Sequence, residues 1–330
     1  MKRLLVLALV CLAVVSCKKD DEDDNNGNNG NSSTCSSVNG YTAIPDTAFE
    51  QALIDFGLDD VMDGQVLTIN ISNQESLFID GEGISDLTGI ECFTALTQLY
   101  CSNNQLTILD VSQNIELETL YCAENQITSL DVSNNTSLTN LHCGSNQLTS
   151  LNVSQNTALT ELICGFNELT NLNVSQNTAL IEMRCSHNQF TSLDVSQNTA
   201  LIELNCSGNQ LMSLDVSQNT ALIKLYCVAN QLTSLDVSQN TALRELHCDY
   251  NQLTSLDVSQ NTNLDHLYCA DNQLTCLNLK NGNNSIFSAN NNPNLTCIEV
   301  DDPNWATQNW GTNNGQWTYS TNCNYPAGCF

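Results

Sequence analysis

The chain has 330 residues, of which 36 are acidic and 8 are basic, and its formal net charge is -28. Nucleic acids and anionic membrane surfaces are bound through basic faces, so this charge excludes both as partners held by electrostatic attraction. Apolar residues make up 41% of the chain, which is enough for a buried core.

The N-terminus has the form of an export signal. Residues 1–3 include two basic residues, and residues 4–15 form an apolar run of 12 residues. That run is too short for a membrane-spanning helix and is typical of a secretory signal peptide, which we predict over residues 1–16.

The apolar run ends in Val14-Val15-Ser16-Cys17, which resembles the lipobox of bacterial lipoproteins. The resemblance implies cleavage before Cys17, diacylglycerol on Cys17, and a lipid anchor as the means of holding the protein at a bilayer. The alternative is an ordinary signal peptide followed by an incidental cysteine.

Residues 17–34 are predicted to be the lipidated cysteine and a disordered tether, because no apolar residue follows Cys17 in this stretch. Such a tether has an average reach of roughly 20–25 Å. The acidic cluster at residues 20–24 resembles the export signal of surface-exposed lipoproteins in some Gram-negative bacteria. It implies an outer-membrane protein that faces outward; the alternative is a linker without a sorting role.

Residues 35–76 are predicted to form an N-terminal cap. Thr47 and Glu50 have capping-box spacing, and Gly57 is a plausible helix end. The helix between them has one apolar face, made of Phe49, Ala52, Leu53 and Phe56. The alternating stretch at residues 67–71 indicates a strand.

Cysteine and asparagine then recur with a fixed step of 21 residues. The cysteines stand at positions 101, 122, 143, 164, 185, 206, 227, 248 and 269, and the asparagines three residues after each. A fixed period of this kind marks a solenoid of stacked coils. Residues 96–106 fit LxxLxCxxNxL, and residues 106–114 repeat the form as LxxLxVxxN.

These nested repeats resemble the cysteine-ladder subclass of bacterial leucine-rich repeats, including internalin-J-type adhesins. For residues 77–300 we therefore expect a β-rich leucine-rich-repeat solenoid of nested 21-residue coils with parallel sheets. A small helical cap precedes it, and an irregular cap at residues 301–330 follows it. In each coil, residues equivalent to 99 and 101, and to 109 and 111, should point inward from short strands.

The asparagine column is expected to bind turn backbone groups of its own coil and of the next coil, because buried polar groups need partners. The nine ladder cysteines are expected to be buried free thiols, since an odd number cannot pair completely and free cysteine packs as a small apolar residue. Metal binding or disulfide formation by this column is the alternative.

The C-terminal end departs from the pattern. Ala289 replaces the ladder cysteine, and the later aromatic residues are expected to seal the core rather than bind sugar: Trp305, Trp310, Trp317 and Tyr319. Apart from Cys11 in the predicted signal peptide, six further cysteines lie outside the lipobox and the ladder, at positions 35, 92, 276, 297, 323 and 329. Cys276 and Cys297 should lie on adjacent coils, close enough for a disulfide; Cys297 with Cys323 is the competing pair.

The sequence contains no metalloprotease, serine-hydrolase, P-loop or dinucleotide-binding motif, so we predict that the protein is not an enzyme and needs no cofactor. One column of aspartates is a weak candidate for Ca²⁺, which prefers carboxylate oxygens; its best members are Asp194, Asp215, Asp236 and Asp257. The alternative is that these side chains accept turn N–H bonds or face water.

One half of the repeat varies while the other is nearly constant. The LDVSQNT half barely changes, whereas outward positions in the LxxLxC half differ from coil to coil, which is typical of a recognition surface on a rigid scaffold. The predicted partner-binding residues are Tyr100, Tyr121, His142, Arg184, Tyr226, His247, Tyr250 and Tyr268. We therefore predict a surface lipoprotein that binds a protein or glycan, as in adhesion; the alternative is a structural envelope protein without a specific ligand.

Overall fold

A computed structural model describes residues 35–283, 286–311, 315–325 and 329. The predicted signal peptide, the lipidated Cys17 and the tether lie outside the described residues.

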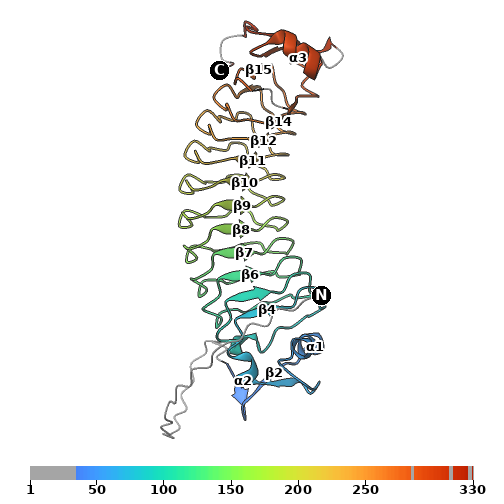
Figure 1. Cartoon of the computed structure of the whole chain (residues 1–330), viewed down its shortest axis with the longest axis vertical. Helices are drawn as coiled ribbons and strands as arrows, with labels where there is room; N and C mark the ends of the chain where they lie inside the picture. The colour runs from blue at the N-terminus through green and yellow to red at the C-terminus, as the bar shows by residue number, and fades with distance from the viewer. Residues whose placement is uncertain (1–34, 284–285, 312–314, 326–328, 330) are drawn as a thin grey trace, which may run out of the picture. The chain divides into compact units, whose positions relative to one another are not determined.

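A parallel sheet runs through the stacked coils (Figure 1). In the part of the chain that the structure describes, this sheet has 11 strands of three residues. Each inner strand pairs in parallel with the equivalent strand of the preceding and the following coil. From β4 to β14 the middle residue of each strand is buried. The strands are β4 (Ser76–Phe78), β5 (Gln98–Tyr100), β6 (Thr119–Tyr121), β7 (Asn140–His142), β8 (Glu161–Ile163), β9 (Glu182–Arg184), β10 (Glu203–Asn205), β11 (Lys224–Tyr226), β12 (Glu245–His247), β14 (His266–Tyr268) and β16 (Ile286–Ser288).

The second half of the coil forms strands only near the C-terminus. A four-stranded parallel sheet consists of β13 (Ser255–Asp257), β15 (Cys276–Asn278), β17 (Cys297–Glu299) and β18 (Thr318–Ser320). The prediction of a strand at residues 109–111 was wrong, although Leu109 and Val111 are buried as expected. Side chains of a second asparagine column, rather than strand pairing, join the coils there.

The first asparagine column binds backbone groups of two coils, as Asn125 illustrates. Its Nδ2 donates to the carbonyls of Cys122, 3.2 Å away, and of Cys101 in the preceding coil, 3.0 Å away. Its Oδ1 accepts from the N–H of Leu106 at 3.0 Å. The predicted structural role is confirmed, but the second partner is the preceding coil and not the next one.

The second column lies at the equivalent place in the other half and is fully buried. Asn156 Nδ2 donates to the carbonyls of Val132 at 2.9 Å and Asn135 at 2.8 Å, both in the preceding coil. These amides bind carbonyls that no helix or strand partner reaches. The coils are therefore tied together on both sides of the core.

The core is one continuous apolar column. The leucines and valines of the repeat are buried throughout, and so are their replacements Ile127, Met183 and Phe190. In the described residues all nine ladder cysteines are buried and free, as predicted. Burial raises the pKa of these thiols, to about 12 for Cys143 and for Cys206.

The N-terminal cap contains β1 (Ser37–Val38), β2 (Tyr41–Ala43), α1 (Thr47–Asp55), β3 (Gln65–Leu67) and α2 (Thr68–Ile71), and η1 (Ile90–Cys92) follows β4. The predicted helix is present, but its capping residue is not Thr47. Asp46 accepts from the N–H groups of Ala48 and Phe49, and Glu50 instead accepts from Asp63 and Gly64 in a later loop.

Two further expectations about this cap were wrong. Phe56 is 42% exposed and does not share the buried face of α1. Residues 67–71 are not one strand, because the chain forms the helical turn α2 after Leu67; this buries Ile71 and leaves Ile69 69% exposed.

Gly89 has φ of 106° and lies so close to the Ala43 carbonyl and the Ile44 side chain that a Cβ there would overlap both.

The C-terminal cap is built from α3 (Pro303–Trp310) and β18, and it closes the opposite end of the solenoid from α1 (Figure 1). Cys276 and Cys297 lie on the adjacent strands β15 and β17, as predicted, but they do not pair with each other: of the two pairings left open, Cys297–Cys323 is present, together with Cys276–Cys329 and Cys35–Cys92. The C-terminal segment crosses β15 and β17, where Tyr325 Oη donates to the carbonyl of Leu277 at 2.7 Å. Cys276 in β15 and Cys297 in β17 therefore each form a disulfide with a cysteine of that segment.

Replacing a ladder asparagine should be costly. Asn167→Ala removes the amide that binds the carbonyls of Cys143 and Cys164 and the N–H of Leu148. Leaving such groups buried and unpaired is expected to destabilise the fold by about 3 kcal/mol. Urea unfolding followed by circular dichroism measures this loss, and the exposed Gln176→Ala should change stability by less than about 0.5 kcal/mol. Equal shifts in the two variants would contradict the assigned role.

The ladder thiols should be unreactive in the folded protein. Thiolate is the reactive form, and burial both raises the pKa of these cysteines and excludes reagents. At pH 8, peptide mapping after maleimide treatment should find the nine ladder positions unmodified in the native protein and fully modified in guanidinium chloride. Rapid native labelling at several of them would show that the coils open more readily than this packing allows.

Candidate functional site

The outward side chains of the 11-stranded sheet form a surface that we call the variable face. It consists of the first and third residue of each strand, which flank the buried middle residue. Strand pairing aligns these residues in two columns. From β5 to β14, the first column is Gln98, Thr119, Asn140, Glu161, Glu182, Glu203, Lys224, Glu245 and His266, and the second is Tyr100, Tyr121, His142, Ile163, Arg184, Asn205, Tyr226, His247 and Tyr268.

Four aromatic rings contact one another in sequence along the N-terminal part of the second column. Ring centroids lie 4.8 Å apart for Phe78–Tyr100 and for Tyr100–Tyr121, and 3.8 Å apart for Tyr121–His142. Burial, followed by the charge of Glu161, raises the pKa of Tyr121. Phe78 stacks on Tyr100 and Tyr121 stacks on His142, whereas Tyr100 and Tyr121 meet edge to face.

A cluster of charges occupies the centre of the face. Arg184 lies between two glutamates, with Nε 2.7 Å from Glu182 and Nη2 3.0 Å from Glu203. Lys224 Nζ is 3.6 Å from Glu203, and His142 Nε2 is 2.8 Å from Glu161. Three carboxylates on consecutive coils would repel one another, and Arg184 and Lys224 offset that repulsion.

A second aromatic group follows on the C-terminal side. His247 lies 4.8 Å from Tyr226 and 4.5 Å from Tyr268, measured between ring centroids. Tyr226 Oη donates to Glu245 at 2.6 Å; burial and this bond raise the pKa of the phenol. Burial also lowers the pKa of His247, which favours its neutral form.

The structure brings seven of the eight predicted partner-binding residues into one column of the variable face. Tyr250 stands apart: it lies three residues after β12, at the border of the sheet, and is 60% exposed. At the same border Phe166 stacks on His187, with ring centroids 4.2 Å apart. Those two residues belong to the variable part of the repeat in the sequence, but they are not among the eight predicted partner-binding residues.

The aspartate column is used by the turns. The carboxylates of Asp194, Asp215, Asp236 and Asp257 each accept from the N–H of the serine two residues later, at 2.9 Å. Hydrogen bonds from that serine lower the pKa of Asp194 and Asp215. Among the described residues, no group of three or more acidic, cysteine or histidine side chains is placed to hold a metal ion.

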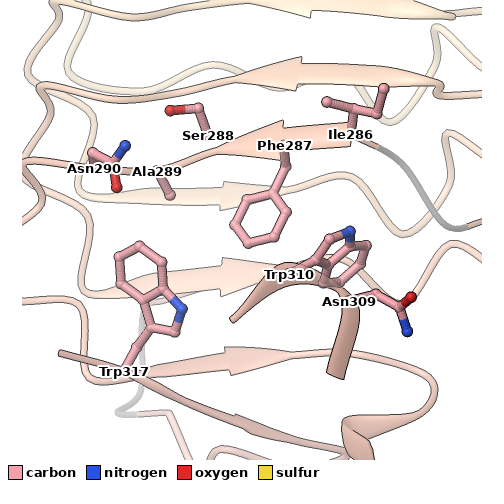
Figure 2. A pocket seen from close by; sticks show the side chains of 8 residues that line it. All are labelled: Ile286, Phe287, Ser288, Ala289, Asn290, Asn309, Trp310 and Trp317. Atoms are coloured by element: carbon pink, nitrogen blue, oxygen red, sulfur yellow. The ribbon is translucent and has the colours of Figure 1, made fainter. Parts of the chain in front are cut away.

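A pocket of ≈ 470 Å³ lies beside β16, the last strand of the main sheet (Figure 2). Phe287 points between Trp310 and Trp317 there, and its ring centroid is 4.8 Å from that of Trp310. Trp317 is only 4% exposed, and its Nε1 donates to Tyr319 Oη at 3.2 Å. These aromatic side chains therefore close the end of the core, as expected from the sequence.

No helix in the described ranges is long and apolar enough to cross a lipid bilayer. No protein-family model matches the chain, and no curated protein sequence matches it. Solved structures do match.

The functional domain of InlJ from Listeria monocytogenes, which includes a cysteine ladder, is 34% identical; the match covers 79% of this chain and 67% of that one, with a TM-score of 0.65. The internalin InlF of the same bacterium shares the fold at 20% identity, covering 84% of this chain and 91% of its own, with a TM-score of 0.64. Internalin C2 does so at 22% identity, 69% and 97% coverage, and a TM-score of 0.55. The chain belongs to the internalin-type leucine-rich-repeat proteins that carry a cysteine ladder.

Proposed function

We propose that this protein is a lipid-anchored surface protein that binds a partner through the variable face, as in adhesion or recognition. The observation that supports this most is the contrast within each coil. The fold needs the same buried residues in every coil, and the half with the LDVSQNT sequence is nearly constant. The variable face has no such requirement, yet it gathers rings and charges.

The composition of the face favours a protein over a glycan as the partner. Sugars are usually held against the open face of an aromatic ring, whereas in two pairs here, Phe78 with Tyr100 and Tyr121 with His142, a ring face is covered by the neighbouring ring. Tyrosine and arginine are frequent anchors in protein interfaces, because they combine apolar area with hydrogen-bonding groups. All four histidines and three of the four basic residues after position 19 lie on this face or at its border.

The anchor proposed for residue 17 rests on the lipobox sequence alone. It would place the solenoid outside the cell, with the tether between lipid and cap. The enzymatic alternative has little support in the site, because several of its ionisable side chains are paired with one another and no group placed to hold a metal ion is found in the described ranges.

Binding should depend on the second aromatic group. The full chain is tested against an array of purified extracellular proteins and glycans, beside a variant with Tyr226→Ala, His247→Ala and Tyr268→Ala. We expect a protein to bind and its affinity to fall by about 100-fold or more in the variant, because each buried interface aromatic contributes about tenfold.

A matched control carries Gln197→Ala, Gln218→Ala and Gln239→Ala, three exposed positions in the constant half. It should bind like the unmodified chain. Binding to a glycan instead of a protein would show that the partner class is wrong. Equal loss of affinity in both variants would show that the binding site is not on this face. Binding to nothing on the array would favour the structural role.

Lipid attachment should require Cys17. Cys17→Ser is expected to abolish incorporation of an alkyne-labelled fatty acid and to move the protein from the membrane fraction to the soluble fraction, because a thiol is the acceptor of the diacylglycerol. Ser16→Ala keeps a small residue before the cysteine and should retain the label. Labelling of Cys17→Ser would show that the anchor is elsewhere.

A further inference from the structure

The residue before each ladder asparagine has a left-handed backbone. In the described coils φ is 53–57° at Asn103, Glu124, Ser145, Phe166, His187, Ala229, Tyr250, Asp271 and Asn291, and 66° at Gly208. Each N–H in this column points to a carbonyl of the next coil, as for Phe166 to Ser186 and His187 to Ser207, both at 2.8 Å. The coil therefore imposes this conformation whatever the side chain.

Two residues in this column are poorly suited to it. Asparagine, aspartate and glycine adopt the left-handed region most readily, and several coils use them. Phe166 and Tyr250 are bulky, and their side chains are 56% and 60% exposed, so burial does not offset the strain. Strained residues of this kind persist where a function requires the side chain.

The Phe166 ring is held in a fixed position with one face open. The ring of His187 stacks against one face at an interplanar angle of 9°. Gly208 makes room for this arrangement, because a Cβ there would lie 3.2 Å from the His187 ring. The neighbour on the other side is Ser145, whose short side chain is too small to cover the opposite face of the phenyl ring.

The ring faces of both residues, the acidic neighbours of Tyr250 and the net charge of the chain favour a positively charged ligand. The face of a phenyl or phenol ring attracts cations, and lysine and arginine are the cations of proteins. Tyr250 is flanked by Asp249 in its own coil and by Asp271 in the next. The chain as a whole has a net charge of -28, which draws cationic partners and repels anionic ones.

We propose that Phe166 and Tyr250 are anchor residues for a protein segment rich in lysine and arginine, which lies along the border of the variable face. This rests on the proposed function, because the column borders that face three residues after each strand. The two anchors are four coils apart, about 19 Å at the strand spacing of a sheet. An extended segment of about six residues spans that length.

The experiment selects a display library of random 12-residue peptides on the full chain and measures affinities of the enriched peptides, made synthetically. Enriched peptides should carry lysine or arginine and bind more weakly as NaCl is raised. Phe166→Asn and Tyr250→Asn should each weaken binding about tenfold and raise the melting temperature by about 2 °C, because asparagine relieves the strain.

Glu124→Asn is the matched control, since it has the same backbone conformation and no aromatic ring. It should also raise the melting temperature and keep the affinity within twofold. Enriched peptides without basic residues, no enrichment, unchanged affinity in both asparagine variants, or a lower melting temperature in them would each overturn the proposal. If only the variant with Tyr226→Ala, His247→Ala and Tyr268→Ala lost binding, the proposed function would be supported and the role of Phe166 and Tyr250 as anchors would be rejected.

Discussion

The solenoid depends on the pairing of buried backbone carbonyls by asparagine side chains. A coil of 21 residues turns too sharply for helices or long strands to satisfy its backbone, and the structure has strands of only three residues. Each amide of the first column binds carbonyls in two coils, and each amide of the second binds two in the coil before. An apolar residue of similar size would leave several buried polar groups unpaired.

That constraint explains which positions are free to change. Leucine, valine, cysteine and asparagine are fixed by the core and by the ladders, and the aspartate–serine pairs are fixed by the turns. The first and third residues of each strand in the 11-stranded sheet have no such structural role. The same constraint imposes the left-handed residue before each asparagine, where a bulky side chain costs on the order of 1 kcal/mol. Diversity on the variable face is therefore nearly neutral for stability, whereas diversity at its border is not.

The sequence was sufficient for the features that repeat and insufficient for those that occur once. A fixed period identifies the ladders and the buried columns, because every coil offers the same information again. Asp46 as helix cap, and Glu50 as acceptor for Asp63 and Gly64, depend on how one loop folds back. The pairing of Cys276 with Cys329 depends on a segment that crosses two strands. The left-handed column is not readable from residue type alone, because only Asn103, Gly208, Asp271 and Asn291 in it are of the types that adopt this conformation most readily.

Charge on the variable face is a weaker guide to function than its aromatic residues. Arg184 and Lys224 lie among Glu182 and Glu203, so a scaffold that stacks like charges at one-coil spacing already needs them. Exposed ion pairs of this kind contribute little to stability, and both cations are already paired within the face. The constant half tolerates its aspartates without cations, because their carboxylates bind backbone N–H groups. Exposed rings have no comparable structural use, and at Phe166 and Tyr250 they act against the backbone, which is why recognition is the better explanation for them.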